Sequence, residues 1–215
     1  MPEPHIPILL DRSALREGLG ISRRRPGWFP AKAIMLATSP YKFRIPPDMW
    51  NHDAIIVRDP KDGVLKIGDA LMGSGCVLTP IEDWEKDCVE NGTKILVWKV
   101  AGITREQEKA AAQWWLDNVA GHEYDKVAIW RLGLKWLAGD WLSGKVGLES
   151  DFYCTEGVRD SFAKGGGSGA DVWWPKDNAT PETTWKRWKD LWILTVHEAV
   201  SEAGRPYCLD MALRT

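Results

Sequence analysis

The sequence has few cysteines, few histidines and no excess of charge of one sign. Its four cysteines form no Cys-x-x-Cys pair, so neither a disulfide framework nor a structural zinc site is expected. The four histidines form no His-Glu-x-x-His motif, and the glycine-rich stretch 165–169 lacks the Lys-Ser/Thr ending of a phosphate-binding loop. Lys and Arg total 28 against 30 Asp and Glu, which argues against binding to a nucleic-acid backbone. The sequence therefore predicts no metal, no cofactor and no nucleic-acid partner.

Long apolar runs are missing as well. No stretch approaches the roughly 18 apolar residues that a membrane-spanning helix needs. The first residues, MPEPHIPILL, have the pattern of neither a secretory signal nor a transit peptide. We therefore expect no transmembrane segment and a cytoplasmic protein, although delivery elsewhere by other machinery is compatible with the sequence.

Phe and Tyr are scarce, at four each, whereas tryptophan is abundant at 14 residues. Seven tryptophans occur at helical spacing, which is typical of a buried helix face: Trp114, Trp115, Trp130, Trp141, Trp185, Trp188 and Trp192. Other tryptophans fall outside such stripes and are open to a binding role. Among these, Trp50 lies two residues before His52 and is a candidate to line a substrate groove.

Turn residues divide the chain into short strands and helices. Strands are predicted at 33–37, 54–57, 64–67, 76–78 and 94–100, with turn chemistry at 59–63 between the second and third. Helices are predicted from Thr104 with a capping-box spacing to Gln107, at 127–141, from about 150–154 to 164, and after residue 180. Residues 191–196 fit either a helix or a final strand.

The predicted elements indicate one α+β domain at residues 31–215, with a small antiparallel sheet packed against helices. Residues 1–30 are expected to be an irregular N-terminal arm. The arginine cluster at 23–25 within this arm has the composition of a solvated turn.

Cys154 is the cysteine best placed for chemistry. It lies in the first turn of a predicted helix, where unpaired N–H groups lower a thiol pKa. The other cysteines are predicted to be packed small hydrophobic residues. His52, at the entry of a strand, is the candidate base, and it falls directly opposite Asp69 if residues 58 and 63 pair across the turn. Without that register, His52 is a strand-end surface residue and Asp69 a turn residue.

Four segments around these residues resemble a known family. Residues 152–158 (FYCTEGV) are similar to an aromatic-Cys-Ser/Thr-Glu-x-Val signature, and residues 51–57 (NHDAIIV) to a Ser-His-Val-Gly-Ile-Val strand. Residues 66–70 (KIGDA) with 75–80 (GCVLTP), and residues 121–125 (GHEYD), match further elements. Together they resemble the circularly permuted papain-like amidases, the YiiX-like branch of the NlpC-type superfamily, which is related to lecithin-retinol acyltransferase. Order and spacing are more specific than any single motif.

The resemblance implies a papain-like fold and a cysteine-dependent hydrolase that cleaves a peptide or acyl-amide bond through an acyl-enzyme. Cys154 would be the nucleophile, His52 the base and acid, and Asp69 the orienting third residue, with the oxyanion at the start of the cysteine helix. The substrate would be a cell-wall peptide or a lipid. Two alternatives stay open: a non-catalytic binding or structural module, and an acyltransferase that uses the same Cys–His pair.

Overall fold

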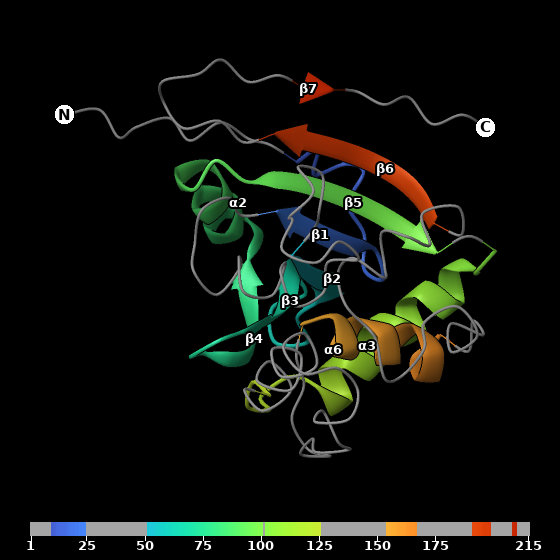
Figure 1. The fold of residues 1–215 in the computed structure, drawn as a ribbon. Coiled ribbons are helices and arrows are strands. Elements are labelled where there is room, and N and C mark those ends of the chain that lie inside the picture. The colour runs from blue at the N-terminus through green and yellow to red at the C-terminus, as the bar shows by residue number, and fades with distance from the viewer. Residues whose placement is uncertain are drawn as a thin grey trace, which may run out of the picture.

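The computed structural model describes residues 10–24, 51–100, 102–125 and 154–166, and the backbone of residues 191–198 and 208–209. These residues form an α+β fold in which helices cover an antiparallel sheet (Figure 1). Within these ranges, no helix is both long and apolar enough to cross a membrane.

The described residues contribute seven strands to one sheet, in the order β4-β3-β2-β1-β5-β6-β7. Every neighbouring pair is antiparallel. The strands are β1 (Gly20–Arg24), β2 (His52–Arg58), β3 (Leu65–Leu71), β4 (Gly75–Pro80), β5 (Lys94–Val100), β6 (Leu191–Glu198) and β7 (Cys208–Leu209). The open alternative at residues 191–196 is thereby decided in favour of a strand.

Strand β1 lies at the centre of this sheet, between β2 and β5. The prediction of an irregular arm over residues 1–30 is therefore wrong for Gly20–Arg24. Gly20 is suited to this position because an added Cβ would lie 2.3 Å from the indole ring of Trp98 on the neighbouring strand. The missing side chain thus leaves room for a large buried tryptophan against the backbone of β1.

Two hydrophobic clusters cover the two faces of the sheet. Helix α2 (Ile81–Glu90) packs on one face, where Trp84 and Cys88 join Ile56 and Ile67. Helices α3 (Arg105–Asn118) and α6 (Cys154–Asp160), the latter continued by the π-helical turn η1 (Ser161–Gly165), share a cluster with the other face. Figure 1 shows α3 and α6 side by side on that face. Helix α6 therefore packs against β2 from the side opposite to α2.

The capping box that the sequence predicts at Thr104 is confirmed: its hydroxyl accepts a hydrogen bond from the Gln107 N–H, and the Gln107 side chain accepts from the Thr104 N–H. The helix face is also as predicted in outline, since Trp115 is buried in the core while Trp114 packs against it as a partly buried residue. A tryptophan of this helix is thus core, as its spacing indicates.

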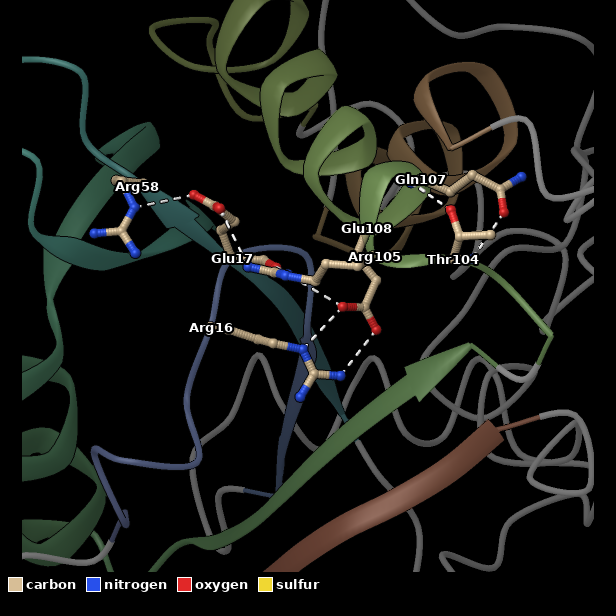
Figure 2. Close-up of polar contacts among 7 residues, drawn as sticks. All are labelled: Arg16, Glu17, Arg58, Thr104, Arg105, Gln107 and Glu108. Atoms are coloured by element: carbon tan, nitrogen blue, oxygen red, sulfur yellow. Dashed lines mark hydrogen bonds and ion pairs between the residues drawn. The ribbon is translucent and has the colours of Figure 1, made fainter.

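A network of charged groups holds the segment before β1 against α3 (Figure 2). The buried carboxylate of Glu108 accepts hydrogen bonds from Arg16 at 2.9 and 3.0 Å and from Arg105 at 3.1 Å. Glu17 in turn contacts Arg105 and Arg58, at 3.2 and 3.1 Å. Leu15 and Leu19 of this segment are buried in the cluster that contains Ile56 and Trp84, so residues 10–19 belong to the folded body.

Several predicted features lie outside the described residues. These are the strand at 33–37, the helices at 127–141 and after residue 180, residues 150–153 of the predicted cysteine helix, and Trp50.

Candidate functional site

His52 and Asp69 form a hydrogen bond between the imidazole Nε2 and the carboxylate Oδ1. The sequence predicts that these two residues lie directly opposite each other. The structure differs, because β2 and β3 pair as Arg58↔Leu65 and Ile55↔Gly68. Continuing this register places Asp69 opposite Ala54, two residues along β2 from His52. The predicted register is thus wrong by two residues. An offset of two keeps both side chains on the same face of the sheet, so their contact survives.

The second oxygen of Asp69 has further partners. The indole N–H of Trp84 on α2 donates to Oδ2 at 3.2 Å, and the guanidinium of Arg23 lies 3.9 Å from the same oxygen. Asp69 is fully buried, and these donors compensate the cost of keeping a carboxylate away from water. The carboxylate is therefore held on both sides, with one oxygen toward His52.

Arg23 is a buried part of this site. It lies opposite His52 across β1 and β2, contacts Asp87 at 2.8 Å, and packs over the Trp84 ring at 5.5 Å from the ring centroid. The interpretation of residues 23–25 as a solvated turn is wrong for Arg23, since only 7% of this residue is exposed. Arg23 thus adds a fixed positive charge next to the His52–Asp69 pair.

The imidazole of His52 is held in its charged form. Burial by itself lowers the pKa of His52, but the adjacent Asp69 carboxylate outweighs burial and the opposing charge of Arg23. The negative charge of a Cys154 thiolate acts in the same direction as Asp69, and the net result raises the pKa of His52 to about 9. His52 is therefore mostly an imidazolium at neutral pH.

The pKa values of Asp69 and Cys88 are shifted in opposite directions. Burial raises the pKa of the Asp69 carboxyl, but the charges of His52 and Arg23 and the hydrogen bonds from His52 and Trp84 outweigh burial and lower it. Burial raises the pKa of the Cys88 thiol to about 12 in spite of the nearby Arg23. Asp69 is therefore ionised at neutral pH, whereas Cys88 is a neutral thiol, as expected of a packed cysteine.

Cys154 is the first residue of α6 and is almost fully buried. Its Sγ lies 3.9 Å from the hydroxyl of Thr155, and α6 packs on β2 and β3, the strands of His52 and Asp69. The predicted helix is confirmed from Cys154 onward, with Val158 and Phe162 buried on one face. Cys154 therefore lies at the end of α6 that meets the start of the His52 strand.

A second chain of buried hydrogen bonds joins α6 to the sheet. Thr155 Oγ1 donates to Asp53 Oδ2 at 2.9 Å, and Ser22 Oγ donates to Asp53 Oδ1 at 2.5 Å. The indole N–H of Trp98 then donates to Ser22 Oγ at 2.9 Å. This chain links α6, β2, β1 and β5 on the face of the sheet opposite to Asp69.

The structure thus brings His52 and Asp69 into contact and places Cys154 within electrostatic range of His52. Sequence reasoning missed four residues of the site: Arg23, Asp53, Trp84 and Thr155. Their sequence signals are weak because each depends on a partner far along the chain. His122 is exposed in the loop after α3.

The described residues also bear on two other kinds of site, a metal site and a surface pocket. Across the described ranges, no group of three or more His, Cys, Asp and Glu side chains has the arrangement of a metal site. A surface hollow of about 530 Å³ lies at the opposite end of β2 from His52, between Arg58 and Gln113 of α3. The hollow contains none of the predicted site residues.

No protein-family model matches this chain, and no curated protein matches it either. Among solved structures, the chain is similar to the crystal structure of the metalloprotein YiiX from Escherichia coli O157:H7. The two chains are 20% identical, the match covers 81% of each, and the TM-score is 0.46.

Proposed function

We propose that this chain is a cysteine-dependent hydrolase that cleaves an amide bond through an acyl-enzyme. The observation that supports the proposal most is the buried His52–Asp69 hydrogen bond, formed where Cys154 acts electrostatically on the imidazole. A nucleophile, a base and a third group that orients the base are what a thiol hydrolase requires. Cys154, His52 and Asp69 take these roles in the proposal.

The charge of His52 decides how it would begin the reaction. With its pKa raised to about 9, the imidazole is protonated at neutral pH. An adjacent imidazolium stabilises a thiolate, which is the nucleophilic form of cysteine. His52 therefore starts as the counter-ion of Cys154 and as the acid, and Asp69 keeps the ring oriented and charged.

In the first step, the Cys154 thiolate attacks the carbonyl carbon of the substrate. The C–N bond breaks as the His52 imidazolium gives its proton to the leaving amine, and the acyl group stays on Cys154 as a thioester. In the second step, neutral His52 takes a proton from water while the water oxygen attacks the thioester carbon. The C–S bond breaks, a carboxylic acid leaves, and thiolate and imidazolium are restored.

The finer parts of the proposal come from the resemblance of the motifs. In chain order, His52 and Asp69 precede Cys154, as a circularly permuted papain-like enzyme requires. The substrate class is then a cell-wall peptide or a lipid-linked acyl amide, and transfer of the acyl group to an amine or alcohol in place of water is the alternative reaction. The oxyanion position at the start of α6 involves residues 151–153, which lie outside the described residues.

The proposal is tested by thiol alkylation and by turnover. Iodoacetamide should modify Cys154 readily at neutral pH, and His52→Ala should slow this reaction because the thiolate loses its counter-ion. Incubation with muropeptides and with acylated lipids should release a carboxylic acid and an amine. Cys154→Ala should abolish this release, and Cys88→Ala is the matched control that should retain it.

Two results would contradict the proposal. One is turnover that persists in the Cys154→Ala variant. The other is free-thiol reactivity of Cys154 that does not change in His52→Ala, which would instead favour a non-catalytic binding module.

A further inference from the structure

Two residues that take no part in the proposed chemistry connect the cysteine to the histidine. Thr155 directly follows Cys154, and Asp53 directly follows His52. The Thr155 hydroxyl donates to Asp53 Oδ2 at 2.9 Å, across a sequence separation of 102 residues. A single hydrogen bond thus joins the neighbours of the nucleophile and of the base.

This hydrogen bond is shielded from water. Asp53 and Thr155 are both fully buried. A buried carboxyl group is stable only when its oxygens are satisfied, and here Ser22 provides the second donor at 2.5 Å. Ser22 is itself fixed by the indole N–H of Trp98. Three elements of the sheet therefore hold the Asp53 carboxyl group in one orientation toward α6.

Successive side chains of β2 lie on opposite faces of the sheet, so Asp53 and His52 have different neighbours. Ile55 and Val57 belong to the cluster under α3 and α6, and Asp53 faces the same side through its bond to Thr155. His52 faces the other side, with Asp69. Asp53 consequently reaches α6 without displacing the imidazole from its partner.

We propose that Asp53 and Thr155 are positioning residues of the thiol site, whose hydrogen bond fixes the distance between Cys154 and His52. The inference rests on the proposed function. Cys154 is next to Thr155 at one end of this hydrogen bond, and His52 is next to Asp53 at the other end. Loss of the hydrogen bond therefore lets the start of α6 move relative to β2. A displacement of about 1 Å is enough to weaken a preorganised catalytic pair.

The test compares Thr155→Val, which keeps the shape of threonine without its hydroxyl, with Thr155→Ser, which keeps the hydroxyl. Ser161→Ala is the matched control, since its buried hydroxyl donates to the Gly157 carbonyl at 2.7 Å and belongs to the turn after α6. The readout is the rate of Cys154 alkylation by iodoacetamide from pH 5 to 10. The groups that face His52 in this range are Asp69 from β3, Arg23 from β1 and Cys154 from α6.

We expect Thr155→Val to lower the alkylation rate at pH 7 about tenfold or more, because the thiol moves away from the imidazolium that favours its reactive form. Thr155→Ser and Ser161→Ala should stay within about threefold of the wild type. A folded Thr155→Val protein with the wild-type profile would overturn the inference while leaving the proposed hydrolase intact.

Two further outcomes are also decisive. If Thr155→Val does not fold, Thr155→Ala takes its place, because it also removes the hydroxyl that donates to Asp53, and an unchanged profile again overturns the inference. If wild-type Cys154 itself reacts as a free thiol, the proposed function fails, and the inference fails with it.

Discussion

The indole N–H of Trp84 donates to Oδ2 of Asp69 at 3.2 Å, while Oδ1 of the same carboxylate bonds His52. Helix α2 thereby fixes the group that orients the imidazole, although α2 lies on the far side of the sheet from α6. The proposed site therefore depends on both faces of the sheet, and changes on either face should be detectable at His52.

Replacing Asp69 should lower the pKa of the His52 imidazole. In Asp69→Asn, burial and the charge of Arg23 both lower the pKa of His52 with no carboxylate to oppose them. We expect its midpoint to fall from about 9 to below 6.5, measured by NMR of the ring signals across a pH titration. The exposed Asp62→Asn variant is the control and should leave the midpoint near 9. An unchanged midpoint in Asp69→Asn would show that the ion pair does not form.

The same titration has a consequence for stability. A raised pKa in the folded state means that His52 stabilises the fold fully below about pH 6.5, the unfolded value. This contribution is lost as the pH rises through about 9. The free energy of unfolding of the wild type should therefore decline between pH 7 and 10, and urea unfolding of Asp69→Asn should lack this part of the decline.

Trp84→Phe should weaken the support of Asp69 while keeping an aromatic ring. The loss of a donor to a buried carboxylate is expected to cost about 1–3 kcal/mol of unfolding free energy. Because the Asp69 pKa then rises, stability on acidification should begin to fall at a higher pH than in the wild type. Trp115→Phe changes a buried tryptophan of the other cluster and should lose stability without changing the pH at which stability begins to fall. If this pH is the same in the wild type and in both variants, the role of the indole N–H is contradicted.

Glu108→Gln should loosen the segment before β1. Burial raises the pKa of Glu108, but its hydrogen bond with Arg16 and the nearby charges lower it overall. The ionised carboxylate therefore contributes to the free energy of unfolding above about pH 4.3, and this contribution disappears on acidification. We expect a loss of about 1–3 kcal/mol at pH 7 and a flatter decline between pH 5 and 3, from urea unfolding at each pH. The exposed Glu82→Gln variant should resemble the wild type, and a Glu108→Gln protein of equal stability would be the contrary result.

The described cysteines should differ sharply in labelling. A short exposure of the native protein to iodoacetamide at pH 7.5 should modify Cys154 and leave Cys88 unmodified, because burial raises the pKa of Cys88 to about 12. Mass spectrometry of peptides, before and after denaturation, gives both extents in one experiment. Equal rates at Cys88 and Cys154 would remove the distinction between a packed and an activated thiol.

The sequence predicted elements that local patterns specify. The capping box begins α3 at the expected residue, and the apolar runs in β2, β3 and β5 became strands. The register of the β2–β3 hairpin was missed by two residues because Asp59 and Asp62 lengthen the loop. Their carboxylates accept hydrogen bonds from the Lys61 and Val64 N–H groups, each at 2.9 Å, so that Arg58 pairs with Leu65.

Strand β1 could not be predicted in the same way. Ser22 and Arg23 are polar, and they are buried because Asp53, Trp98, Asp69 and Asp87 satisfy them. These partners lie 31 to 76 residues away along the chain. Local composition therefore indicates a solvated segment, and the true environment depends on tertiary contacts that no local pattern contains. The same reason applies to the Asp53–Thr155 bond.

The central place of β1 also bears on how the chain assembles. Strands β2 to β4 and β5 to β7 form two three-stranded groups, and within the described residues β1 is the strand that connects them. The second neighbour of β1 is β5, which begins about seventy residues further along the chain. Pairing over such a separation closes a long loop, and the entropy cost of that loop makes this pairing slow. A truncated chain that starts after residue 24 would present β2 and β5 as unpaired edges, and open edges of this kind promote aggregation.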